Sequence, residues 1–260
     1  MQSYNLKTSD SGVASVTLNR PERHNAFDDS MIAELIDLLG KLEQDDRVRV
    51  LVLRSTGKSF SAGADLNWMR RMADYDQEQN QHDAMQLAEL MQRLNCFPKP
   101  TIALVKGAAY GGGVGLIACC DIAIASQTAS FCLSEVKLGL IPAVISPYVV
   151  EAIGARAARR FMLTAERFDA GQAFRLGLVH EVVETQELDA RLDSIVGFLL
   201  SAGPAAQAET KDLIRTVSNR PIDDELNQSC AKRIARIRAS SEGREGLNAF
   251  LDKRKPNWCE

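Results

Sequence analysis

The chain has no run of about 18 consecutive apolar residues, the length that a membrane-spanning helix needs. It has no excess of basic charge, because 31 Lys and Arg face 34 Asp and Glu, for a net charge of −3. It has only three histidines, and neither His24 nor His180 has a partner at the spacing of metal ligands. These absences predict that the protein has no membrane-spanning segment, no nucleic-acid partner and no metal site.

Paired cysteine motifs are also missing. The six cysteines form no C-x-x-C pair, and Cys119 and Cys120 are neighbours in an apolar run. The first seven residues lack both the apolar stretch of a signal peptide and the arginine-rich character of a transit peptide. We therefore expect reduced, mostly buried thiols and a cytoplasmic location.

What is present is the pattern of one large α/β domain, or of one domain with an appended piece. Of the 260 residues, 45% are hydrophobic, as in ordinary globular proteins. The strands that we predict are residues 13–18, 48–53, 101–105, 121–125 and 131–133, with a short strand or turn at 177–183. The helices that we predict are one that starts after Asp28–Ser30, then 65–94 with a polar interruption at 74–83, 144–153, 155–163, 170–176, 187–200, 205–217 and 223–238. Strands that alternate with helices predict a largely parallel sheet, and the C-terminal third is helical.

Two glycine-bearing turns are the most informative local features. Gly111, Gly112, Gly113 and Gly115 directly precede an apolar run with helical character, and residues 59–66 (SFSAGADL) form a second turn between a strand and a helix. Glycine permits positive φ and close approach to the backbone, while a helix N-terminus presents unpaired N–H groups. Two such turns could hold one oxyanion between them, although each could also be a tight turn without chemistry.

Glu135 is the candidate proton-transfer group. It stands among Leu133, Val136 and Leu138, where a carboxylate is costly to bury unless it is paired or functional. Burial beside apolar neighbours should raise its pKa, which suits proton transfer near neutral pH. Asp65, by contrast, is better explained as a helix N-cap than as a catalytic acid.

Taken together, these motifs resemble the crotonase (enoyl-CoA hydratase/isomerase) superfamily over about 240 residues. The matching segments are 18–21 (LNRP) with 24–26 (HNA), 60–66 (FSAGADL), 106–113 (KGAAYGGG), 120–125 (CDIAIA), 177–179 (GLV) and 245–254 (EGLNAFLDKR). Residues 134–147 (SEVKLGLIPAVISP) are most similar to bacterial methylglutaconyl-CoA hydratases.

The resemblance implies a β-β-α spiral core over residues 1–200 and a helical oligomerisation region over residues 201–260, assembled as a trimer or a dimer of trimers. It implies that the N–H groups of Ala64 and Gly112 hold the thioester oxygen and that Glu135 moves the proton. Coenzyme A enters as part of the substrate, so no separate cofactor is expected. The residues that the resemblance places at the substrate or coenzyme A are Arg23, Ala62, Ala64, Leu66, Gly111, Gly112, Phe250 and Lys253.

One departure from the family pattern leaves the reaction open. Hydratases with two catalytic carboxylates carry glutamates at the positions of Gly115 and Glu135, and here the first is glycine. A glutamate placed at this position should either create a working carboxylate pair or block the acyl tail of the substrate, and we favour blocking because glycine leaves room there.

The first hypothesis is reversible hydration of a branched 2-enoyl-CoA of the 3-methylglutaconyl-CoA type, in leucine or isoprenoid degradation. The alternatives are a Δ3,Δ2-enoyl-CoA isomerase that uses a single glutamate, and a non-catalytic member that binds coenzyme A or RNA.

Overall fold

The computed structural model describes residues 2–259. Its strands form two sheets, one of six strands in the order β1-β2-β3-β5-β7-β10 and one of four in the order β4-β6-β8-β9. The strands are β1 (Tyr4–Thr8), β2 (Val13–Leu18), β3 (Val50–Ser55), β4 (Ser59–Ser61), β5 (Thr101–Val105), β6 (Ala108–Tyr110), β7 (Ile122–Ser126), β8 (Ser130–Cys132), β9 (Phe168–Asp169) and β10 (Glu181–Val183).

The helices are α1 (Asp29–Gln44), α2 (Leu66–Ala73), α3 (Gln77–Asn95), α4 (Gly112–Cys119), α5 (Ser146–Thr164), α6 (Ala170–Leu176), α7 (Leu188–Leu200), α8 (Pro204–Val217), α9 (Asp224–Ala239) and α10 (Ser241–Leu251). Short 3-10 turns lie at Pro21–Arg23, Glu135–Leu138, Thr185–Glu187 and Asn257–Cys259. Among residues 2–259, no helix combines the length and the apolar character that crossing a bilayer requires.

Each turn of the fold adds one strand to each sheet and then one or two helices. The pairs β3/β4, β5/β6 and β7/β8 follow this rule, and they are followed by α2 and α3, by α4, and by α5. The pairings β2–β3, β3–β5, β5–β7 and β7–β10 are all parallel, whereas β1–β2 and β8–β9 are antiparallel. The prediction of an α/β core built as a β-β-α spiral is therefore confirmed.

The central strands of the larger sheet are buried on both faces. Leu51 and Leu53 of β3 pack toward α1, α3 and α4, while Val50 and Val52 pack with Leu188, Leu192 and Ile195 of α7. Side chains alternate between the two faces of a strand, so a strand covered on both sides must be apolar throughout. This explains why β3 is a continuous apolar run.

Several observed elements differ from the predicted ones. The strand predicted at 48–53 lies two residues later, and β1 was not predicted. The polar segment 77–83 is helical, because Asp76 and Gln79 form a capping box that starts α3 after an interruption of only three residues. The two helices predicted on either side of Gly154 form one element, α5, in which Gly154 has a non-helical φ of 74°.

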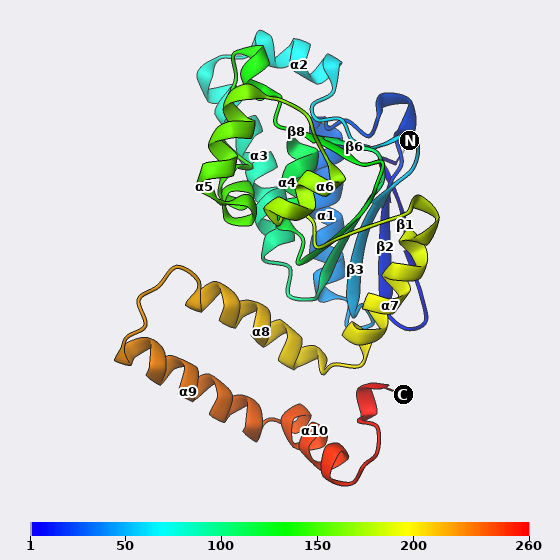
Figure 1. The fold of residues 1–260 in the computed structure, drawn as a ribbon, viewed down its shortest axis with the longest axis vertical. Helices are drawn as coiled ribbons and strands as arrows, with labels where there is room; N and C mark the ends of the chain where they lie inside the picture. The colour runs from blue at the N-terminus through cyan, green and yellow to red at the C-terminus, as the bar shows by residue number, and fades with distance from the viewer. Residues whose placement is uncertain (1, 260) are drawn as a thin grey trace.

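The helices α8, α9 and α10 lie as a separate layer at one end of the molecule, opposite α2 (Figure 1). Arg49 ties this layer to the sheet, since its guanidinium donates to the carbonyl oxygens of Ala202 (2.9 Å) and Trp258 (3.3 Å). Lys211 of α8 adds an ion pair of 2.6 Å with Asp121.

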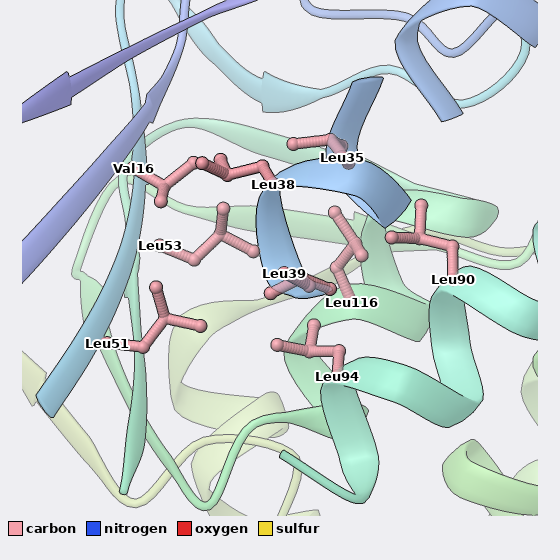
Figure 2. Close-up of a pocket in the computed structure, with 9 residues that line it drawn as sticks. All are labelled: Val16, Leu35, Leu38, Leu39, Leu51, Leu53, Leu90, Leu94 and Leu116. Carbon is pink, nitrogen blue, oxygen red and sulfur yellow. The ribbon is translucent and has the colours of Figure 1, made fainter. Parts of the chain in front are cut away.

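An apolar cavity of about 20 Å³ lies between the large sheet and helices α1, α3 and α4 (Figure 2). Its lining is made of one valine and eight leucines: Val16, Leu35, Leu38, Leu39, Leu51, Leu53, Leu90, Leu94 and Leu116. No polar side chain lines it, so it offers nothing for a water molecule to bond. It is a packing defect of the core, and none of its lining residues belongs to the glycine turns.

We expect Val16→Ile to raise the free energy of unfolding by about 0.5–1 kcal/mol, because the added methyl group fills part of this cavity. Urea unfolding monitored by circular dichroism measures the change. The same change at Val52 is the control: Val52 is fully buried in the packed cluster under α7, so Val52→Ile should lower the stability. Equal losses from both variants would contradict the role of the cavity.

Candidate active site

Three neighbouring parallel strands end at one edge of the smaller sheet. Parallel pairing joins β4 to β6 and β6 to β8, with Ser61 opposite Ala109 and Tyr110 opposite Cys132. The segments that follow these strands carry Ala64, Gly112 and Glu135. Because the carboxyl ends of parallel strands meet at the same edge, the pairing brings together three residues that are far apart in the sequence.

The two glycine turns are in direct contact. A β-carbon built on Gly63 would lie 3.5 Å from the carbonyl oxygen of Tyr110, and one built on Gly111 would lie 3.9 Å from Cα of Gly63. Gly111 has φ of 50° and ψ of −119° at the start of α4, a conformation that side chains rarely adopt. Glycine at these positions therefore allows the two turns to approach each other closely. It also allows the unusual backbone conformation at Gly111.

Each turn presents a backbone N–H group without a partner among the described residues, that of Ala64 in the first turn and that of Gly112 in the second. The backbone of Phe27 bridges the first turn, since its N–H donates to Gly63 (2.7 Å) and its carbonyl accepts from Asp65 (2.7 Å). In this parallel bridge the N–H of Ala64 points away from Phe27. Gly112 is the first residue of α4, where no helical acceptor exists. Within residues 2–259, neither N–H donates a hydrogen bond.

Phe27 links both turns, and the sequence analysis did not single it out. Its backbone pairs with residues 63–65, and its ring would meet a β-carbon on Gly112 at 3.1 Å. Asn25 was quoted only as part of a motif, yet it is fully buried and its amide donates to the carbonyls of Thr56 and Ser59 (both 2.9 Å). A buried asparagine in a polar loop is the signal that could have indicated this anchoring role.

The Glu135 carboxylate lies against Gly111. A β-carbon on Gly111 would be 2.9 Å from Oε1 of Glu135, and Oε2 is buried without a hydrogen-bond partner within residues 2–259. Burial raises the pKa of Glu135 above that of an ordinary glutamate. An unpartnered buried carboxylate oxygen is costly in a structural role, and it is the arrangement that a general base requires.

The raised pKa has a measurable consequence for stability. The folded protein holds its proton at pH values where the unfolded chain has lost it, so stability falls as pH rises from about 4.5 through the raised pKa, and stays lower above it. Relative to the native protein, Glu135→Gln should therefore become progressively more stable over this range, as urea unfolding at a series of pH values would show. A flat difference between Glu135→Gln and the native protein over this range would contradict the burial effect.

Asp65 is the N-cap of α2, as predicted. Its Oδ1 accepts hydrogen bonds from the N–H groups of Asn67 (2.8 Å) and Trp68 (3.2 Å). Arg23 reaches Oδ2 of the same residue at 3.4 Å while its side chain stays 46% exposed. Arg23 thus lies beside the first glycine turn with its guanidinium partly in solvent.

Other predicted substrate-binding residues are dispersed. Leu66 follows the cap with 70% of its surface exposed. Phe250 is 81% exposed on α10, and Lys253 follows that helix. Figure 1 places α10, the helix that carries Phe250, at the opposite end of the molecule from α2, the helix that follows the first glycine turn.

The expectation that Gly115 leaves open space is wrong. A β-carbon on Gly115 would lie 2.3 Å from Cγ2 of Ile145 and 3.3 Å from Cε of Met91. The space is already filled by these side chains, so a glutamate at this position would meet protein before it met an acyl tail.

Two further observations concern metal and thiol chemistry. Within residues 2–259, no group of three or more His, Cys, Asp or Glu side chains is placed to hold a metal ion. All six cysteines are free thiols. Burial raises the pKa of Cys120 to about 12, which makes this thiol a poor nucleophile.

The geometry agrees with comparisons to known proteins. Residues 8–260 match the family described as enoyl-CoA hydratase/isomerase. A solved enoyl-CoA hydratase from Shewanella pealeana superposes with a TM-score of 0.96 and 53% identity, covering 98% of this chain and 96% of the other.

Two curated relatives have names that describe different reactions. The 1,2-epoxyphenylacetyl-CoA isomerase of Escherichia coli is 33% identical over 99% of both chains. The crotonyl-CoA hydratase of Syntrophomonas wolfei is 32% identical over 95% of this chain and 94% of its own. The chain therefore belongs to the enoyl-CoA hydratase/isomerase family, the crotonase superfamily, and is an enzyme of that family.

Proposed function

We propose that this acyl-CoA enzyme reversibly hydrates a branched 2-enoyl-CoA of the 3-methylglutaconyl-CoA type. The observation that carries the proposal is the buried, unpartnered carboxylate oxygen of Glu135 at the same sheet edge as the free N–H groups of Ala64 and Gly112. The proposed identity of the acyl group is supported only by the similarity of residues 134–147 to bacterial methylglutaconyl-CoA hydratases.

In the proposed reaction, the N–H groups of Ala64 and Gly112 donate to the thioester oxygen. Glu135 takes a proton from water while the water oxygen bonds to C3, and the electrons of the C2–C3 double bond move toward the thioester oxygen. The enolate charge is held by the two backbone donors. Glu135 then returns its proton to C2, which restores the carboxylate and completes the 3-hydroxyacyl-CoA.

A Δ3,Δ2-isomerase is the second candidate, and the absence of a carboxylate at Gly115 favours it. A single base can move a proton between C2 and C4 without water. Incubation of candidate acyl-CoAs in H₂¹⁸O, followed by mass spectrometry, separates the two. Label in a 3-hydroxyacyl product supports hydration, whereas conversion of a 3-enoyl-CoA to its 2-enoyl isomer without label supports isomerisation. Family membership and the presence of Glu135 speak against a non-catalytic coenzyme A- or RNA-binding role.

We further propose that residues 201–260 form the oligomerisation region of a trimer or hexamer. Large apolar side chains stand exposed along this part of the chain, among them Ile214, Ile222, Leu247, Phe250 and Leu251. Across a subunit boundary, Phe250 and Lys253 would approach the coenzyme A bound by a neighbour, beside the Arg23, Ala62 and Leu66 of that neighbour. We also propose that the protein is cytoplasmic and that it uses no cofactor other than the coenzyme A of its substrate.

Removal of the residues after Arg238 should lower the oligomeric mass and weaken coenzyme A binding, because the exposed apolar side chains of α10 are lost with it. Light scattering and calorimetric titration with coenzyme A measure the two effects. Phe250→Ala and Lys253→Ala are the matched point variants, which should weaken coenzyme A binding while the fold is kept. An unchanged mass and an unchanged affinity in the truncated protein would rule out this role for the segment.

A further inference from the structure

Two glycines stand at the first turn of α4. Gly111 is its N-cap, and the N–H of Gly115 donates to the carbonyl of Gly111 at 3.2 Å. The Glu135 carboxylate lies against this turn at Gly111, and Ile145 lies against it at Gly115. Glu135 and Ile145 therefore both lie against the first turn of α4.

Ile145 cannot easily clear this space. A β-carbon on Gly115 would lie 3.0 Å from Cβ of Ile145 as well as 2.3 Å from its Cγ2. Rotation about χ1 moves Cγ2 but leaves Cβ in place, and β-branched side chains have few χ1 states. The residue is only 2% exposed, and its carbonyl accepts the N–H of Val149 (3.0 Å) where α5 begins. Its position is thus fixed by both backbone and side-chain packing.

The side chains that lie against Gly115 are apolar. The pKa of Glu135 is raised by burial, and no charged neighbour contributes to the shift. Ile145 and Met91 form the wall where a second carboxylate would otherwise project from α4. A wall of this kind neither orients a water molecule nor exchanges a proton.

We propose that Ile145 excludes a second carboxylate from the site and thereby makes Glu135 the only proton-transfer group. This inference rests on the proposed role of Glu135 and deepens it, since Ile145 becomes a specificity-determining residue. The steric part of the proposal does not depend on the reaction, and it is tested separately from the chemical part.

The steric test uses alanine. Alanine normally stabilises a helix relative to glycine, yet Gly115→Ala should lower Tm by roughly 2–8 °C because its β-carbon meets Ile145. Ile145→Ala is itself destabilising because it leaves a cavity, so the comparison is made within that background, where adding Gly115→Ala should lower Tm little or not at all. Gly197→Ala on α7 is the matched control, because no atom lies within 4 Å of a β-carbon there, and it should raise Tm. If Gly115→Ala also raised Tm, Ile145 would not fill this space.

The chemical test asks whether an introduced carboxylate can replace Glu135. In the native background, Glu135→Gln should lower kcat by about 10²–10⁴-fold. In the Gly115→Glu/Ile145→Ala background, the same change should cost at least tenfold less, and the pH profile of kcat/KM should show a second ionisation. With Gly115→Glu alone, Ile145 still blocks the site, so neither effect should appear.

The outcomes separate the two proposals. If Glu135→Gln is harmless in the native background while the alanine series behaves as expected, the proposed function fails and the steric inference stands. If the cost of Glu135→Gln is the same with and without Ile145→Ala, the inference about Ile145 is wrong although Glu135 remains the base.

Discussion

Replacement of Glu135 by glutamine should lower kcat by about 10²–10⁴-fold, the usual contribution of general acid–base catalysis. Glutamine keeps the shape of the side chain next to Gly111 but cannot accept and return a proton. The fold should persist, because the carboxylate oxygen Oε2 makes no hydrogen bond that the change would break. Steady-state turnover of a panel of 2-enoyl- and 3-enoyl-CoA thioesters measures the loss.

Glu151→Gln is the control for this experiment. Glu151 is an exposed carboxylate on α5, and its replacement should leave turnover unchanged. If Glu135→Gln retained most of its activity on every thioester tried, the carboxylate would be structural and the mechanism proposed above would be wrong.

Gly112→Pro should reduce kcat/KM by about 10²–10³-fold, because it removes one of the two donors to the thioester oxygen. Loss of one such donor costs roughly 2.7–4 kcal/mol of transition-state stabilisation. Proline is tolerated at the first position of a helix, since the N–H there has no helical acceptor. Gly112 occupies this position in α4.

The steric effect of a larger side chain at position 112 must be distinguished from the loss of the backbone N–H donor. Gly112→Ala keeps the N–H and adds a β-carbon at 3.1 Å from the ring of Phe27, so it measures the steric cost alone. We expect Gly112→Pro to be at least tenfold less active than Gly112→Ala. Equal activity of two folded variants would show that this N–H does not bind the thioester oxygen.

Local chemistry made much of the fold predictable. Asp28 and Asp65 cap α1 and α2 with side-chain oxygens, and each of these caps is visible in the sequence as an aspartate just before the helix. The alternation of β2 and the continuous apolar run of β3 also follow from neighbouring residues alone. The strands β1, β4, β6 and β9 were not predicted; β4, β6 and β9 are only two or three residues long, too short to show a periodic pattern.

The site was predicted from a family resemblance more than from local pattern. The raised pKa of Glu135 was deduced from its apolar neighbours, although one of them, Leu138, is 58% exposed. The partnership of Ala64 with Gly112 came from matching motifs. Phe27 and Asn25 were missed because their contacts, with Gly112 and with Thr56 and Ser59, join segments far apart in the chain.

The sequence by itself determined the helix caps, the two glycine turns and the single carboxylate at Glu135, since each depends on residues within a few positions of one another. Only the tertiary structure decided that Ala64, Gly112 and Glu135 share one edge, because that depends on the parallel pairing of β4, β6 and β8. It also decided that Ile145 fills the space beside Gly115. Whether a volume is empty depends on every chain segment that passes it, and these segments are brought together by packing rather than by sequence order.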